Sequence, residues 1–394
     1  MALTIAKRCT SIVHMTMADM AELADRKPNA IRLENADISL PPPRHVIQAT
    51  QEAVGVDRYN SYLPLQGLIE MRQAIADRYD ADLGIRYNPE GEVLVTCGAG
   101  EAMLDVLLTY VDAGDKVLMT NPTYNGMAQR VRLANGVQVF ADLVEEQGWH
   151  LDPAAFRERA RGCKVIFYSS PSMPTGTVFR PDETQLISEV AAENDALLIF
   201  VAAVDKITFD GSRVVHPATL PGMRDRTITV GCVTKNYNMI GWRIGWAVGP
   251  RALLKPVHDV HIFNAIMPSG YAQAGAIAAL TGPQDEVKAS VEIFQRNRDV
   301  LVARLMSIPG MRIVKPEGGL FFLANISALG VSSTEFCTKL LEEEEVAITP
   351  MVAWGSDDFG HEHVRFIFTN EPEDRLIEAA ERIARFVRRN YAIV

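Results

Sequence analysis

Gly231-Cys-Val-Thr-Lys-Asn-Tyr-Asn-Met-Ile-Gly-Trp-Arg-Ile-Gly-Trp-Ala-Val-Gly249 is the stretch that decides the fold, and it follows a short apolar run at residues 227–230. Its charged residues are Lys235 and Arg243. A lysine amine among apolar groups loses proton affinity and attacks carbonyl carbons, whereas arginine stays charged and binds phosphate oxygens. The segment therefore predicts a reactive amine beside a phosphate anchor. A surface loop with two ordinary cations is the alternative, but the flanking tryptophans favour burial.

Short apolar runs and amphipathic stretches alternate around this segment, from about residue 80 to about residue 280. The apolar runs predict buried strands at residues 93–96, 116–120, 138–141, 164–168, 196–201 and 227–230. Helices are expected at residues 102–111, 124–135 and 183–194. This alternation predicts an α/β fold with a mostly parallel sheet that is covered on both faces. Ligands of such sheets bind beyond the carboxyl ends of the strands.

The pattern changes after about residue 285 and predicts a second, smaller α+β unit. Helices are expected at residues 286–305, 333–341 and 373–389, and strands at 312–314, 320–323, 346–348 and 364–368. A further helix at residues 12–26 predicts an N-terminal arm. We expect a large domain at residues 45–285, and a small domain made of residues 1–44 and 286–394.

Composition excludes several classes of function. The 394 residues carry a net charge of -10, which argues against nucleic acid or an anionic membrane as the main partner. No apolar run is long enough to cross a bilayer, and the first residues lack a signal-peptide layout, so we expect a cytoplasmic protein. The five cysteines are scattered and are expected to be reduced. His258 and His261, or the cluster at residues 361–363, lack an evident third ligand, so no metal is predicted.

A series of short motifs occurs in a fixed order along nearly the whole chain. They are Tyr62-Leu-Pro-Leu-Gln-Gly67, the loop at Gly98, Asn121-Pro-Thr-Tyr124, Pro174-Thr-Gly176, Lys235 with Arg243, Pro316-Glu-Gly-Gly319 and Val364-Arg365. Each alone is weak, but together they resemble the fold-type I, class I and II aminotransferases, which use pyridoxal 5′-phosphate (PLP). The resemblance implies a fold-type I architecture, a PLP cofactor, an α-amino acid or related substrate, and a homodimer.

The resemblance also implies a role for individual residues at the cofactor. Lys235 matches the lysine that forms an imine with PLP and later moves the Cα proton. Arg243 matches the arginine that binds the cofactor phosphate, and the backbone amides of Ala99 and Gly100 would assist it at a helix N-terminus. Tyr124 matches the aromatic residue that stacks on the pyridine ring.

Two further matches concern the neighbouring subunit and the substrate. Tyr62 matches the tyrosine that reaches the phosphate of the partner subunit, and Arg365 matches the arginine that binds the substrate α-carboxylate. Aromatic packing remains the alternative for Tyr62 and Tyr124, and a strand-end ion pair remains the alternative for Arg365.

The chain departs from the family pattern around the pyridine ring. Met173 stands where the family has an asparagine that donates to the ring oxygen. An ungapped alignment places Val201 at the aspartate that pairs with the ring nitrogen, and Val204 at the tyrosine that donates to the ring oxygen. Two more positions differ: Cys232 replaces a phosphate-binding serine, and Ala36 replaces a glycine near the substrate carboxylate.

Loss of the carboxylate beside the ring nitrogen weakens the cofactor as an electron sink, because that carboxylate keeps the pyridine protonated. Two hypotheses follow. In the first, the protein is an enzyme that holds PLP on Lys235 and performs transamination or a more specialised elimination, replacement or racemisation. In the second, the fold has abandoned PLP and serves as a PLP-independent catalyst or a binding protein. A bulge that brings Asp205 to the ring nitrogen is a minor alternative, and Glu101 is an awkward charge beside the expected phosphate.

Overall fold

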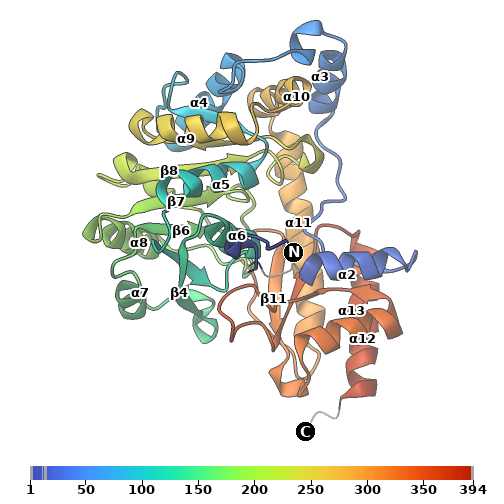
Figure 1. Ribbon diagram of the computed structural model, residues 1–394. Helices are drawn as coiled ribbons and strands as arrows, with labels where there is room; N and C mark the ends of the chain where they lie inside the picture. Colours follow the sequence, from blue (N-terminus) through green and yellow to red (C-terminus); the bar gives the residue numbers. More distant parts are fainter. Residues whose placement is uncertain (1–2, 11, 13–15, 392–394) are drawn as a thin grey trace.

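The computed structural model describes residues 3–10, 12 and 16–391 (Figure 1). The predicted N-terminal helix at residues 12–26 falls partly outside these residues, because 13–15 are not described; its described part is α2 (Thr16–Asp25). None of the described helices is both long enough and apolar enough to cross a bilayer.

An eight-stranded sheet with the order β2-β9-β8-β7-β6-β3-β4-β5 forms the centre of the larger part of the molecule. Neighbours from β8 to β4 are parallel, and the outer strands β2, β9 and β5 pair antiparallel. The strands are β2 (Val93–Thr96), β3 (Lys116–Asn121), β4 (Val137–Val144), β5 (His150–Leu151), β6 (Val165–Ser169), β7 (Leu197–Ala202), β8 (Thr227–Cys232) and β9 (Gly245–Val248). The prediction of a mostly parallel sheet is confirmed.

Helices cover both faces of this sheet, because alternate strand residues are apolar on both sides. Ile199 and Val201 face the core that contains α5 and α6, whereas Leu198 and Phe200 face the core that contains α7 and α8. The helices of this part are α3 (Arg44–Val54), α4 (Ile69–Leu83), α5 (Ala99–Tyr110), α6 (Asn125–Leu133), α7 (Pro153–Arg159), α8 (Pro181–Glu193), α9 (Arg251–Asn264) and α10 (Gly270–Thr281). Short 3-10 turns lie at Asp57–Asn60, Glu145–Gln147, Pro217–Thr219, Arg224–Arg226 and Ile240–Trp242.

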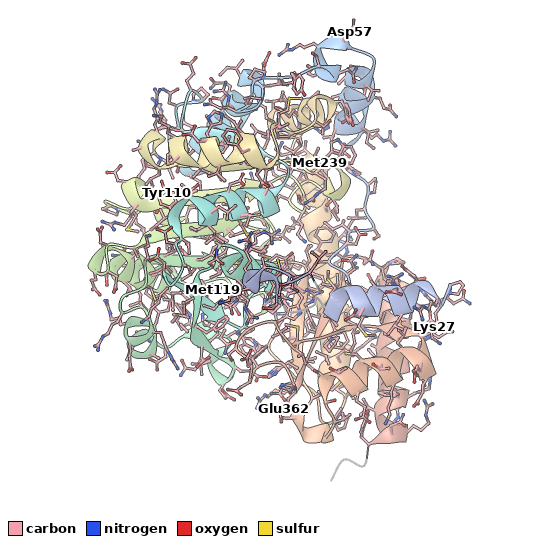
Figure 2. All side chains as sticks on the ribbon, viewed as in Figure 1. Lys27, Asp57, Tyr110, Met119, Met239 and Glu362 are labelled. Atoms are coloured by element: carbon pink, nitrogen blue, oxygen red, sulfur yellow. The ribbon has the colours of Figure 1, made fainter. Side chains whose placement is uncertain are left out.

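Side chains fill the space between these layers (Figure 2). Met119, on β3, is 1% exposed within the core between the sheet and α6. Tyr110, at the end of α5, donates from its hydroxyl to the Leu253 carbonyl at 2.7 Å and so ties α5 to α9. This hydrogen bond holds the C-terminal end of α5 against α9.

The second part joins the two ends of the chain. Its four-stranded sheet has the order β10-β11-β14-β13, and a short parallel pair joins β1 to β12. Its elements are β1 (Ile31–Arg32), β10 (Arg312–Ile313), β11 (Phe321–Asn325), β12 (Val346–Ala347), β13 (Thr349–Pro350), β14 (His363–Ile367), α11 (Asp285–Met306), α12 (Ser333–Glu344), α13 (Glu373–Asn390), the described α2 and a 3-10 turn at Ser327–Leu329. The short α1 (Lys7–Thr10) instead packs against α6 of the larger part. Figure 1 shows α11 running from beside α10 towards α12 and α13. We propose that these two parts are the domains with bounds 45–285 and 1–44 plus 286–394.

Candidate active site

Lys235 and Arg243 lie in the connection between two neighbouring strands. β8 ends at Cys232, the chain turns, and β9 returns antiparallel with Gly245 opposite Cys232. The connection therefore places both cations at the carboxyl end of β8. Arg243 adopts a left-handed conformation with φ of 54°, and its Nη1 donates to the Ile240 carbonyl at 3.1 Å.

A cavity of about 260 Å³ opens at this end of the sheet. Its cationic lining residues are Lys235, Arg243, Arg365 and Arg130. No aspartate or glutamate is among the described residues that line it. A cavity with this charge favours a ligand that carries several negative charges.

The Lys235 amine is prepared to act as a nucleophile. Burial lowers the pKa of Lys235 to about 8; the nearby Cys232 opposes this decrease, while the charges of Arg365 and Arg243 add to it. A substantial fraction of the amine is consequently neutral near physiological pH, and the neutral amine is the form that attacks a carbonyl carbon.

The N-terminus of α5 forms one wall of the cavity, and Ala99 and Gly100 contribute to the lining. Gly98 precedes the helix with φ of 82°, and a Cβ atom there would lie 2.8 Å from Nη2 of Arg243. A Cβ at Gly245 would lie 2.4 Å from the Ala99 nitrogen. Glycine at both positions lets Arg243 and β9 approach the free amides of a helix N-terminus, an arrangement that suits a phosphate.

Arg365 lies on β14 and enters the cavity from the second part of the molecule. It is 2% exposed, and its Nη2 donates to the Glu34 carbonyl at 2.6 Å and to Thr349 Oγ1 at 3.3 Å. Its guanidinium carbon lies 4.4 Å from the centroid of the Trp354 ring. Burial lowers the pKa of Arg365 to about 10, and Tyr124 and Glu34 oppose the decrease. Because the buried Nε has no hydrogen-bond partner among the described residues, the guanidinium can still bind a carboxylate.

Tyr124 and Trp354 form an aromatic wall of the same cavity. Their ring centroids are 5.8 Å apart, with an interplanar angle of 52°. Tyr124 immediately precedes α6, and a Cβ at Gly126 would lie 2.4 Å from its ring. Gly126 therefore lets the tyrosine ring fold back beside the helix start, where it presents a flat face to a ligand.

The structure brings most of the sequence-predicted site residues together. The remaining predicted residues that line the cavity are Met173, Val201, Cys232 and Ala36. Val201 and Cys232 are the inward-facing residues at the ends of β7 and β8, and they are 1% and 3% exposed. Apolar side chains thus occupy the positions at which the sequence comparison expected polar contacts.

Two predicted residues do not line this cavity. Val204 is 1% exposed in the core, and Ala203 faces the cavity instead. Val201 and Ala203 thus face the cavity with the two-residue alternation of an extended chain, and the predicted Val204 is not among the described residues that line it. Tyr62 lies outside the cavity and is 82% exposed.

Asp205 faces away from Lys235. Its Oδ2 lies 3.2 Å from Nε2 of His216, and its Oδ1 accepts from Nδ2 of Asn236 at 2.8 Å. All three residues line a different cavity beside α4. The alternative in which Asp205 reaches the ring nitrogen position is therefore wrong.

Glu101 is not among the described residues that line the cavity. Its Oε2 accepts a hydrogen bond from the backbone N–H of Cys97, just before α5 begins. Its Oε1 lies 2.5 Å from Nδ1 of His261, whose Nε2 lies 3.0 Å from the Leu65 carbonyl. Asp105 and Glu101 raise the pKa of His261 to about 9 although burial opposes the increase. Sequence reasoning missed these two carboxylates as partners of His261. The sequence analysis found no third ligand beside His258 and His261, whereas here Nδ1 of His261 and carboxylate oxygens of Glu101 and Asp105 all lie within 4.8 Å of one another.

Comparison with known proteins agrees with this geometry. The family model "Aminotransferase class I and II" matches residues 28–383. The chain belongs to the class I and II aminotransferase family. It is 31% identical to the aspartate aminotransferase of Bacillus subtilis, over 98% of this chain and 99% of the relative. It is 32% identical to the LL-diaminopimelate aminotransferase of Desulforudis audaxviator, over 97% and 98% of the two chains.

Solved aminotransferase structures share the fold of this chain. The N-succinyldiaminopimelate aminotransferase of Mycobacterium tuberculosis superposes with a TM-score of 0.91 at 32% identity, over 97% of this chain and 99% of that one. The fold-type I architecture is therefore confirmed, as is the assignment to PLP-dependent transferases. Nothing in the comparisons supports the alternative of a fold that has abandoned PLP.

The cavity of this aminotransferase-family chain fits three groups of PLP: the phosphate, the aldehyde and the face of the pyridine ring. The α5 N-terminus with Arg243 suits the phosphate, the Lys235 amine suits the aldehyde, and the Tyr124 ring suits the pyridine face. The apolar Val201 offers no charge to the pyridine nitrogen. When bound, PLP supplies the electron-withdrawing ring that loosens the Cα substituents of an amino acid.

Sequence reasoning missed several residues of the cavity. They include Arg130 on α6, Trp354, Asn35, Met17 and Phe321. Most come from segments whose sequence carries no short motif. Arg130 had a usable signal, because it follows Tyr124 by less than two helical turns in a helix expected to border the cavity.

Proposed function

We propose that the protein is a PLP-dependent enzyme that acts on an α-amino acid through Lys235. The observation that carries this proposal is the cavity in which a lysine amine, a phosphate-type helix N-terminus with Arg243, and the buried Arg365 lie together without a carboxylate. Arg365 would bind the substrate carboxylate, and Tyr124 would hold the cofactor ring from one face. Lys235 would hold the cofactor, and its amine would then accept the proton from the substrate Cα.

Amino-group transfer is the reaction that the relatives' names favour. The experiment mixes the protein with PLP and single α-amino acids, and measures the matching 2-oxo acid and pyridoxamine phosphate by mass spectrometry. We expect both products with at least one amino acid. Absence of pyridoxamine phosphate with every common amino acid, although PLP is attached to Lys235, would contradict transamination and favour the second candidate below.

The second candidate is an elimination, replacement or racemisation at the same site. Val201 and Met173 favour it, because both line the cavity where the family pattern has polar groups at the ring. Without a carboxylate, the pyridine nitrogen stays mostly unprotonated, and reactions that need less stabilisation of negative charge at Cα become competitive. Such a reaction would release products other than a 2-oxo acid with pyridoxamine phosphate, so the same assay separates the two candidates.

Val201→Asp should strengthen PLP binding. A carboxylate at the end of β7 would pair with the protonated ring nitrogen, and one charge-assisted hydrogen bond of about 1.5–3 kcal/mol corresponds to roughly 10- to 100-fold in affinity. The measurement is the dissociation constant of PLP, followed by visible absorbance. Val201→Asn is the matched control, since it has the same size and no charge. Equal affinities for the two variants would show that Val201 does not occupy the ring-nitrogen position.

We further propose a cytoplasmic homodimer in which Tyr62 of one protomer completes the phosphate site of the other. The Tyr62 ring is highly exposed on a loop outside its own cavity, so it is free to reach a neighbouring protomer, which supports this assignment. The family resemblance of the Tyr62–Gly67 motif is the second support.

A further inference from the structure

The turn that begins α5 lies between two arginines. On one side, a Cβ at Gly98 would lie 2.8 Å from Nη2 of Arg243. On the other side, a Cβ at Gly100 would lie 2.7 Å from Nη2 of Arg130. Each guanidinium therefore approaches within contact distance of the turn, and each fits because the residue it meets is glycine.

Arg130 is held in this position by two backbone carbonyls. Its Nε donates to the Gly100 carbonyl at 2.7 Å, and its Nη1 donates to the Gly126 carbonyl at 2.6 Å. The third nitrogen, Nη2, makes no hydrogen bond with any residue that the structure describes, and Arg130 lines the same cavity as Lys235. The Arg130 side chain is thus held so that its Nη2, which has no hydrogen-bond partner among the described residues, lies at the N-terminus of α5.

The charge of the nearby groups leaves Arg130 available for a ligand. Glu101, the residue after Gly100, is hydrogen-bonded to His261, and no carboxylate is among the described residues that line the cavity. Cys232 stands where a serine hydroxyl would donate to phosphate, and a thiol is a much weaker donor. Compared with the family pattern, the part of the cavity expected to bind phosphate thus lacks the serine hydroxyl. It has an additional guanidinium, that of Arg130.

We propose that Arg130 is a second phosphate-binding arginine, which offsets the loss of the serine hydroxyl at Cys232. This inference rests on the proposed function, since it assigns Arg130 to the phosphate of PLP. Arg243 approaches the α5 N-terminus at Gly98 and Arg130 approaches it at Gly100, and the phosphate dianion would accept hydrogen bonds from both guanidinium groups and from the helix amides.

The test compares PLP with pyridoxal, which has the same aldehyde and ring but no phosphate. Dissociation constants of both compounds are measured by visible absorbance for the wild-type protein, Arg130→Met, Arg130→Lys and Arg132→Met. Arg132 lies on the same helix but does not line the cavity, so its variant controls for changes in α6. Thermal unfolding without ligand shows whether each variant is folded.

Arg130→Met should weaken PLP binding roughly 10- to 100-fold, as expected for one charge-assisted hydrogen bond, and leave pyridoxal binding unchanged. Arg130→Lys should keep part of the PLP affinity, because it keeps the charge, and it replaces the methionine variant if that protein does not fold. Arg132→Met should bind PLP like the wild type.

Two results would overturn the assignment. PLP affinity that is unchanged in Arg130→Met shows that Arg130 does not bind phosphate. An equal loss for PLP and pyridoxal shows that the arginine only supports the turn through the Gly100 and Gly126 carbonyls. Failure of the wild-type protein to bind either compound would overturn the proposed function and the Arg130 assignment together, so the two failures are distinguishable.

Discussion

Lys235→Ala is expected to abolish covalent attachment of PLP and to lower turnover of every substrate by about four orders of magnitude. The amine is both the group that bonds the cofactor aldehyde and the base that moves the Cα proton, and removal of such a group typically costs a factor of this size. The measurements are the visible absorbance of the protein with PLP, and the rate of product formation from the best amino acid found.

The pH dependence of attachment gives a second signature of the same amine. The pKa of Lys235 is lowered to about 8, so the neutral fraction, and with it the rate of attachment, should rise as the pH increases through about 8 and level above that. Lys206→Ala is the control, since Lys206 pairs with Asp82 beside a different cavity. Attachment that persists in Lys235→Ala, or is lost in Lys206→Ala, would contradict the assignment.

Arg365→Ala is expected to lower kcat/KM for amino acids by roughly 100- to 1,000-fold while PLP binding is retained. Truncating one partner of a buried, hydrogen-bonded charge pair costs about 2–5 kcal/mol, and each 1.4 kcal/mol is tenfold. The guanidinium is buried over Trp354 with its Nε unpartnered among the described residues, so the substrate carboxylate would become its main anionic partner.

The control for Arg365 uses the substrate instead of a second variant. The wild-type enzyme should bind an amino acid far more tightly than the amine that lacks its carboxylate. Arg365→Ala should bind the two compounds about equally, because the group that distinguishes them is gone. If the variant weakens both compounds by the same factor, Arg365 supports the fold of the cavity and does not bind the carboxylate.

The sequence predicted the alternating strands and helices well, because their apolar runs are continuous and bounded by polar turns. β2 begins at Val93 and ends at Thr96 as predicted, and β8 extends its predicted range by two residues to Cys232. The strand β9 was missed, although Trp246 indicated burial. Its four residues were read as part of the Lys235–Arg243 segment, because no separate turn motif marks where that segment ends and the strand begins.

The site was predicted where a short motif contains the residue itself. Lys235, Arg243, Arg365 and Tyr124 meet in one cavity as the resemblance implied. Val204 is not among the described lining residues, because an alignment does not show which side chains beyond the end of a strand face a cavity. The orientation of Glu101 could not be read from its sequence neighbours, because its partner His261 lies 160 residues away. Contacts of this kind depend on the packing of α5 against α9.

Borohydride trapping of PLP on the wild-type protein, followed by peptide mapping, tests the central claim most directly. Reduction fixes the bond between the cofactor carbon and the amine that holds it, and mass spectrometry then locates the modified lysine. Attachment through Lys235 predicts a single stoichiometric modification, on the peptide that contains Lys235, which disappears when an excess of a substrate amino acid is added before reduction. A protein that stays unmodified with excess PLP, or is modified at other lysines, would contradict it.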